Sequence, residues 1–215
     1  MNTKEKILTE ALNLFSVRGY EAVSVRDIAR AVGIKESSLY NHFKNKQDIF
    51  DTILSEYSAR TSEYFYRMQL TEEHKQFAAD ERTVNMYKNM MPKQFADTAG
   101  QIFEFIFTDG INVKLRKMLT IEQYRSAKAA TLFRKISFDD SVNFQAALFD
   151  GMIKAGCFIK TDPYMLALEF FSPIFLIFYK FDNNEQSLKE AKELFLRHIR
   201  HFNETYGVSD IGGDK

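Results

Sequence analysis

The chain has 215 residues, 45% of them hydrophobic and 27% charged, and its 29 basic residues balance 29 acidic ones. This composition suffices for one or two domains with apolar cores, and it excludes collagen-like, low-complexity and wholly disordered chains. Only three prolines and nine glycines are present, which favours long helices with few breaks.

The single cysteine, Cys157, excludes an intramolecular disulfide framework and a cysteine-rich zinc site, and it fits a reducing compartment. We favour a small buried apolar group over a redox sensor for this residue. The N-terminus carries charges within its apolar pattern, unlike a signal peptide, and the most apolar stretch, residues 170–179, is too short to span a bilayer. We therefore expect a cytoplasmic protein.

The first predicted helix covers residues 3–18. Its apolar side chains recur at helical spacing, among them Ile7, Ala11 and Phe15. Gly19 follows just past the last turn, where glycine commonly ends a helix.

A second and a third short helix follow. Ser24 can cap the second helix, with Asp27 three residues later in a variant of the capping box, and Gly33 ends it. The polar segment GIKESSLYNHFKNK, residues 33–46, begins the third helix, and Asn45 can cap a fourth. Three short helices with a glycine in the turn between the second and third predict a helix-turn-helix head.

Charge is unevenly distributed along the chain. Residues 1–46 hold eight Lys or Arg and five Asp or Glu residues, a local charge of +3, so the remainder carries −3. A basic head on a slightly acidic body is compatible with binding of nucleic acid by the head.

The third helix has a different chemistry on each side when residues 36–43 are placed on a helical wheel. Leu39 and Phe43 share the face that points into the head. The opposite face is short and polar and suits base edges in a DNA major groove. We predict that Ser37, Ser38 and Asn41 face the bases, and Lys35, which directly precedes this helix, is a further candidate. Residues placed to contact phosphates are Ser24, Arg26, Tyr40, His42, Lys44 and Lys46.

The stretch VSVRDIARAVGIKESSLYNHFKNKQDIF resembles the DNA-binding domain of the tetracycline-repressor (TetR) family, over roughly residues 4–50. The pairs that carry the resemblance are Gly33-Ile34, Leu39-Tyr40, His42-Phe43 and Asn45-Lys46. It implies that the third helix enters the major groove and that Tyr40, His42 and Lys46 contact phosphates. Lys35 departs from the Ser or Thr that often caps this helix in the family. Either the cap is weak here, or Lys35 itself contacts DNA.

The rest of the chain is predicted to be helical as well. One long helix covers residues 46–68, and further helices are expected at about 72–90, 92–107, 111–119, 122–136, 138–155, 163–180 and 185–206. We therefore predict an all-α chain of about nine to ten helices. It would comprise a helix-turn-helix domain at 1–46, a ligand-binding and dimerisation domain at 47–206, and a frayed tail at 207–215.

The last two predicted helices resemble the pair through which family members dimerise. The helix at 164–180 is apolar all round, which suits a partner on each side better than solvent. The predicted dimer residues are Phe170, Ile174, Phe178, Leu194, Phe195, His198, Ile199 and Phe202. A two-fold dimer predicts a pseudo-palindromic DNA operator.

The body is rich in aromatic residues, which could fill a core or line a cavity for an apolar, planar or cationic effector. The predicted pocket residues are Tyr57, Tyr64, Phe103, Glu104, Phe107, Tyr124, Phe144 and Phe171. A carboxylate at Glu104 could attract a cation, although an ordinary surface or ion-paired role is also open. In the family-like mechanism, the effector shifts the helix at 46–68 and releases the DNA.

Other classes of function find little support in the sequence. His198, His201 and Glu204 share a helical face, but two histidines without a firm third ligand are a poor metal site. We find no nucleophile–base motif and no cofactor loop, so we expect no enzyme, no cofactor and no metal. A DNA-binding architectural or protein-partnered factor without an effector is the alternative to a ligand-responsive regulator.

Overall fold

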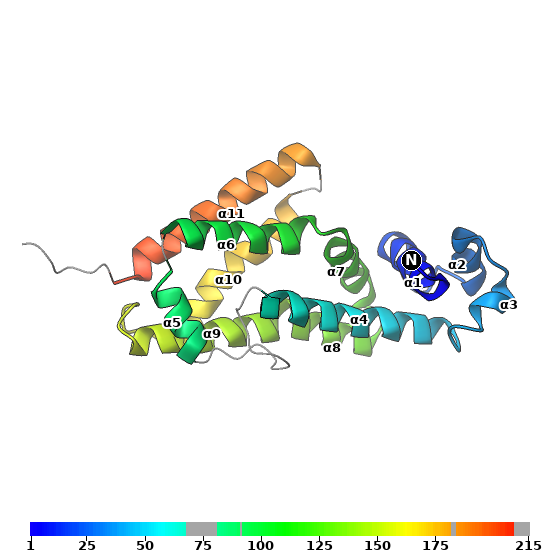
Figure 1. The fold of residues 1–215 in the computed structure, drawn as a ribbon, viewed down its shortest axis with the longest axis horizontal. Helices are drawn as coiled ribbons and strands as arrows, with labels where there is room; N and C mark the ends of the chain where they lie inside the picture. The colour runs from blue at the N-terminus through cyan, green and yellow to red at the C-terminus, as the bar shows by residue number, and fades with distance from the viewer. Residues whose placement is uncertain (68–80, 91, 182–183, 209–215) are drawn as a thin grey trace, which may run out of the picture. The chain divides into compact units, whose positions relative to one another are not determined.

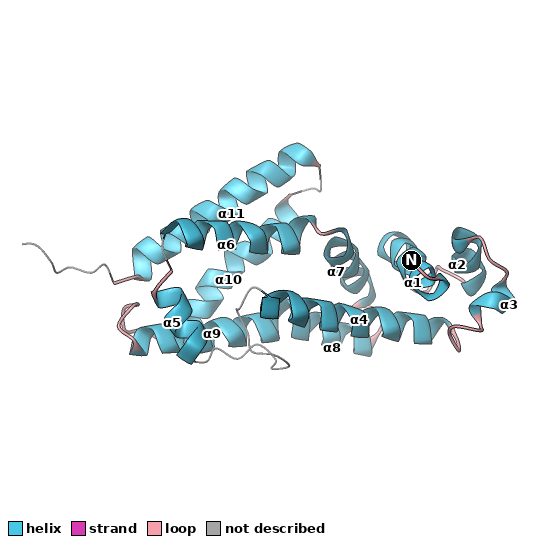
Figure 2. Ribbon diagram, viewed as in Figure 1, coloured by secondary structure: helices cyan, strands magenta, loops and turns pink. Residues whose placement is uncertain are grey.

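The computed structural model describes residues 1–67, 81–90, 92–181 and 184–208, which are helical over most of their length (Figure 1, Figure 2). No strand is found in these ranges, where the β-type pairing is confined to an isolated bridge between Phe158 and Gly207. The prediction of an all-α chain is confirmed. The predicted helix at 72–90 lies partly, and the end of the tail at 209–215 lies wholly, outside the described residues.

The α-helices are α1 (Thr3–Arg18), α2 (Val25–Val32), α3 (Glu36–Leu39), α4 (Lys46–Arg67), α5 (Glu81–Lys88), α6 (Pro92–Phe103), α7 (Gly110–Glu122), α8 (Ala127–Arg134), α9 (Asp140–Lys154), α10 (Pro163–Lys180) and α11 (Glu185–Tyr206). Two short π-helical segments, η1 (Glu104–Thr108) and η2 (Lys135–Asp139), continue α6 and α8. The helix predicted at 122–136 is therefore not continuous. Within that range α8 begins only at Ala127, because Ser126 caps it by accepting a hydrogen bond from the Ala129 N–H at 3.3 Å.

The described helices divide into two compact units. Unit 1 comprises Met1–Tyr64 and Gly110–Lys135, and unit 2 comprises Phe65–Asp109 and Ile136–Lys215. Unit 1 thus combines α1 to α3 and most of α4 with α7 and α8. The functional boundary that we predicted after residue 46 remains a prediction.

The core of unit 1 forms where α1 packs against α2 and α7. Ile7, Ala11 and Phe15 on α1 are fully buried, as the helical spacing predicts, and Leu115 and Met118 of α7 are buried too. Burial of this apolar surface is the main favourable contribution to the stability of unit 1.

Among the described residues of unit 2, apolar side chains pack into two clusters. The first joins Phe103 and Phe107 with Phe195 of α11 and Ile177 of α10. The second joins residues of α9, α10 and α11, namely Val142, Phe149, Phe158, Leu166, Ala167 and Phe202. Among the described helices, we find none that combines the length and the apolar character needed to cross a bilayer.

Candidate nucleic-acid interface

The turn between α2 and α3 depends on Gly33. This residue adopts a left-handed conformation with φ 77° and ψ 31°, which glycine reaches at little cost. The Ile34 N–H donates to the Ala29 carbonyl at 3.0 Å, closing the end of α2. At the other end, Ser24 and Asp27 form the predicted capping box. Local sequence therefore fixes both ends of α2.

Helix α3 is shorter than predicted. It ends at Leu39, and the chain continues to Phe43 in turns, with the His42 N–H and the Phe43 N–H both bonded to the Leu39 carbonyl. The regular helix expected to residue 43 is thus wrong. Lys35 offers no acceptor for the first N–H groups of the helix, which has no side-chain cap. The weak cap that Lys35 suggested is present.

The inner and outer sides of this segment nevertheless follow the predicted division. Leu39 is fully buried and Phe43 is 3% exposed, so both belong to the core of the head. The predicted base-facing residues Lys35, Ser37 and Asn41 are exposed, whereas Ser38 is half-buried. Of the predicted phosphate contacts, Tyr40, His42 and Lys44 are exposed.

Ser24 and Arg26 are already engaged within the protein. The Ser24 hydroxyl donates to Asp27 at 2.7 Å and accepts the Asp27 N–H at 3.1 Å. These bonds from Ser24 hold the pKa of Asp27 below its usual value. Arg26 is exposed and lies 3.5 Å from Glu36. A phosphate would have to compete with these partners, so the structure gives both residues a structural role at the start of α2 and α3.

Lys46 points toward the chain between α1 and α2. Its ammonium donates to the Tyr20 carbonyl at 2.9 Å and lies 4.1 Å from the centre of the Tyr20 ring. Asn45 caps α4 as predicted, accepting the Asp48 N–H at 2.9 Å. An ammonium has three donors, so Lys46 can hold Tyr20 and still bind a phosphate.

Sequence reasoning missed two residues beside this interface, Tyr20 and Glu122. The Tyr20 N–H donates to the Glu122 carboxylate at 2.8 Å, although the two residues are 102 positions apart. One signal was available, because Glu122 continues the buried face of α7 formed by Leu115, Met118 and Leu119. An acidic residue on an apolar helical face indicates a buried partner.

The predicted effector residues do not all behave as cavity walls. Tyr57, Tyr64 and Tyr124 lie in unit 1, where Tyr124 is 86% exposed. In unit 2, Phe103 and Phe107 are buried and stacked on each other, with centroids 4.5 Å apart. Phe144 and Phe171 are half-buried.

Glu104 takes the ion-paired role that was left open. It is half-exposed and accepts a hydrogen bond from Lys192 at 2.6 Å. This bond and a second one from Thr108 lower the pKa of the Glu104 carboxyl. Its charge is therefore already balanced by a lysine.

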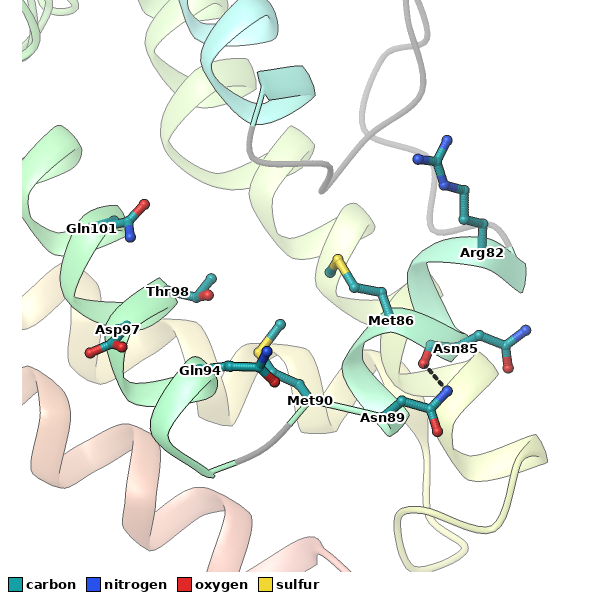
Figure 3. Close-up of a pocket in the computed structure, with 9 residues that line it drawn as sticks. All are labelled: Arg82, Asn85, Met86, Asn89, Met90, Gln94, Asp97, Thr98 and Gln101. Atoms are coloured by element: carbon teal, nitrogen blue, oxygen red, sulfur yellow. Dashed lines mark hydrogen bonds between the residues drawn. The ribbon is translucent and has the colours of Figure 1, made fainter.

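A hollow of about 700 Å³ opens between α5 and α6 within unit 2. Figure 3 shows Arg82 and Met86 of α5 on one side of it and Thr98 and Gln101 of α6 on the other, and Met90 also lines it. None of the eight predicted pocket residues is among those lining it. Its walls are mostly polar, with two flexible thioethers that adapt to varied shapes.

The predicted dimer residues lie largely in the core of unit 2. Ile174, Phe195, Ile199 and Phe202 are at most 6% exposed, and Phe170, Phe178, Leu194 and His198 are half-buried. His198 lies 2.7 Å from the Phe170 carbonyl, and burial lowers its pKa, so the neutral ring donates there. The four fully buried residues cannot reach a partner without opening this core.

Comparison with known proteins identifies the head. The model of bacterial regulatory proteins of the tetR family matches residues 7–53. The similarity to the tetR family is therefore shown for this N-terminal segment. The matched segment contains α2, α3 and the turn that joins them, so the predicted resemblance is confirmed.

Curated relatives match the same segment. One is IcaR of Staphylococcus epidermidis, a negative transcriptional regulator of the biofilm operon icaADBC, which is 45% identical over 47 residues. IcaR of Staphylococcus aureus strain Newman is 46% identical over 48 residues. These matches cover 22% of this chain and span about a quarter of the relatives' length, 25% and 26% respectively. They support the assignment of the N-terminal DNA-binding segment and give no information about the rest of the chain.

Solved structures share the fold over nearly the whole chain. SmeT, the repressor of the Stenotrophomonas maltophilia multidrug efflux pump SmeDEF, superposes with a TM-score of 0.63 at 17% identity, covering 99% of this chain and 94% of SmeT. A SmeT–triclosan complex superposes with a TM-score of 0.66 at 18% identity, covering 98% of this chain and 94% of SmeT. A candidate transcriptional regulator from Saccharomonospora viridis bound to choline superposes with a TM-score of 0.62 at 18% identity, covering 96% of this chain and 98% of that protein. At 17–18% identity, these likenesses show a shared fold.

Proposed function

We propose that the chain is a homodimeric transcriptional regulator that binds a pseudo-palindromic DNA operator through α3 and the turns that follow it. The observation that carries this proposal is the division of that segment. Leu39 and Phe43 anchor it in the core, while Tyr40, Asn41 and His42 stay exposed beside one another. Short polar groups flanked by longer hydrogen-bonding side chains suit a major groove and its phosphate walls.

The proposed action is repression. IcaR is named a negative regulator and SmeT a repressor, which supports this direction for a chain that shares their head or fold. In a two-fold dimer, the two α3 segments would lie one helical turn of DNA apart, roughly 34–36 Å. On α10, apolar side chains available to a partner subunit are Met165, Leu176 and Tyr179, each at least half-exposed and on one helical face.

Selection from a random duplex library tests DNA binding directly. The protein is expected to enrich duplexes with two inverted half-sites about 10 base pairs apart, with affinity that falls steeply as salt rises. We expect Tyr40→Phe to weaken binding to all enriched duplexes alike, because it removes a phosphate contact. Asn41→Ala is expected to change which duplex is preferred, at a cost of about 1–3 kcal/mol per base contact.

Fluorescence anisotropy on the selected duplex and on half-site variants measures both changes. Equal losses on all duplexes from both substitutions would contradict the division of roles. A library that yields no enriched, salt-sensitive duplex would contradict the proposed function itself.

We also propose that a small effector, apolar or aromatic or cationic, releases the operator. The triclosan complex of SmeT and the choline complex of the S. viridis protein support such ligands in this fold. The effector must bind the DNA-incompetent state more tightly than the other. The hollow between α5 and α6, within unit 2, is the candidate site.

A panel of such compounds is expected to contain at least one that raises the melting temperature and weakens binding to the selected duplex. Met86→Lys places a charge in the α5–α6 hollow, so it should abolish both effects if the effector binds there. Lys88→Met, on the same helix but not lining the hollow, is the control. A panel without any stabilising compound would favour the alternative, a DNA-binding factor with a solid aromatic core.

A further inference from the structure

Glu122, at the C-terminal end of α7, presents a buried carboxylate to the head. It is 2% exposed and accepts the Tyr20 N–H at 2.8 Å. The Arg125 guanidinium lies 3.6 Å from the same oxygen. Burying a carboxylate costs several kcal/mol unless hydrogen bonds and an opposite charge satisfy it. The bond to Tyr20 therefore fixes the position of this residue against the end of α7.

The chain approaches the end of α7 closely at Gly19, the residue before Tyr20. A Cβ atom at Gly19 would lie 2.8 Å from Arg125 Nη1, 3.0 Å from Glu122 Oε1 and 3.2 Å from Ile121 Cγ2. These atoms belong to the side chains of Arg125, Glu122 and Ile121, so a larger residue at Gly19 would displace them, the half-exposed Arg125 guanidinium most easily. The position of Tyr20 thus depends on the end of α7.

The other groups of Tyr20 bind the first turn of α4. Its carbonyl and its ring both hold the Lys46 ammonium. Its hydroxyl, whose pKa is raised by burial, donates to Gln47 at 3.0 Å. Gln47 in turn bonds Asp51 at 3.1 Å, and Asp51 pairs with Lys128 of α8. Tyr20 therefore connects α7 to the lysine that we predict to contact phosphate.

We propose that Glu122 is a positioning residue for DNA binding. It does not touch DNA; it holds Tyr20, and Tyr20 directs the Lys46 ammonium. A displacement at the end of α7 would then change the reach of Lys46 without any change in the base-facing segment. This role rests on the proposed function, because it concerns a contact to operator phosphate.

Two conservative substitutions of Glu122 distinguish the effect of side-chain length from the effect of side-chain charge. Glu122→Gln keeps an oxygen at the same reach and removes the charge, whereas Glu122→Asp keeps the charge and is one methylene too short for Tyr20. We expect the Gln variant to behave much like the wild type. The Asp variant should resemble Glu122→Ala, and it guards against a failure of the Ala variant to fold. Circular dichroism confirms the fold of each protein.

Acetylation of the free protein by acetic anhydride, followed by mass spectrometry, tests the link without DNA. In the wild type Lys46 should react more slowly than exposed Lys44, because Tyr20 shields its ammonium. We expect Glu122→Asp and Glu122→Ala to raise the reactivity of Lys46 relative to Lys44 at least twofold. Wild-type reactivity of Lys46 in both variants would overturn the proposal, whatever the protein does with DNA.

Salt titrations with the selected duplex test the consequence. Losing one phosphate contact lowers the slope of log K against log salt by about 0.9, and weakens binding roughly fivefold at 0.15 M salt. We expect this change for Glu122→Asp and for Lys46→Met, with no further loss in the double variant. Asp150→Ala, which removes a partly exposed carboxylate of unit 2, is the control for charge removal and should leave the slope unchanged.

The outcomes distinguish this role from a merely structural one. Destabilisation alone would lower the melting temperature of the Asp variant and leave the slope as it was, which would overturn the proposal. If the wild type shows no salt-dependent binding at all, the proposed function fails, and the acetylation result still reports whether Glu122 holds Lys46.

Discussion

Replacing Phe195 with alanine is expected to lower the free energy of unfolding by about 3–5 kcal/mol, the usual range for a fully buried phenylalanine. The ring is 3% exposed, and its centroid lies 5.5 Å from that of Phe103 and 6.0 Å from that of Phe107. Removing it leaves a cavity that the stacked neighbours cannot fill. Urea denaturation at two protein concentrations measures the loss.

The dependence on concentration decides where Phe195 acts. Substitution of a core residue destabilises the folded chain to the same extent at every protein concentration. Substitution of a subunit-interface residue destabilises a dimer more when the protein is diluted. Leu176→Ala is the matched control, because Leu176 is 60% exposed on α10. We expect it to change the free energy of unfolding by less than about 0.5 kcal/mol and to promote dissociation of the proposed dimer. The opposite pattern would return Phe195 to the interface that the sequence predicted.

The difference between Phe195 and Leu176 illustrates what a sequence pattern can determine. Apolar spacing identified the helices at the C-terminus correctly, since α10 and α11 begin and end at the predicted residues. When a helix is apolar on all sides, its sequence does not show which side packs in the core of the same subunit and which side is left for a partner subunit. That choice depends on α6 and η1, which are distant in sequence and supply Phe103 and Phe107.

The head was more predictable because its determinants are local. The capping box of Ser24 and Asp27, the left-handed Gly33 and the buried pair Leu39 and Phe43 all follow from residues a few positions apart. The length of α3 was wrong because a wheel assumes continuous helix, whereas an uncapped segment of four residues cannot sustain one. The link from Glu122 to Tyr20 joins segments about a hundred residues apart, and no local pattern specifies that pairing.

Replacing Gly19 with alanine is expected to destabilise the protein by at least about 2 kcal/mol. Gly19 has φ 79° and ψ 160°, a region that is essentially reserved for glycine and costs other residues about 1–3 kcal/mol. The added methyl group would also crowd the Arg125 and Glu122 side chains, at 2.8 Å and 3.0 Å. Chemical denaturation measures the combined loss.

Gly33→Ala separates these two causes. Gly33 also has a positive φ, 77°, but its conformation is left-handed helical. Apart from its chain neighbours, no atom of the described residues lies within 4 Å of the position that the added methyl group would occupy, so only backbone strain of about 1 kcal/mol is expected. Because crowding at Gly19 pushes Glu122 away from Tyr20, Gly19→Ala should also raise the acetylation of Lys46, and Gly33→Ala should not. Equal losses of stability in the two variants, with Lys46 unchanged in both, would show that the end of α7 does not govern the position of Tyr20. A larger loss at Gly19 accompanied by a more reactive Lys46 would show that the close backbone contact and the buried carboxylate together position the lysine that we predict to contact phosphate.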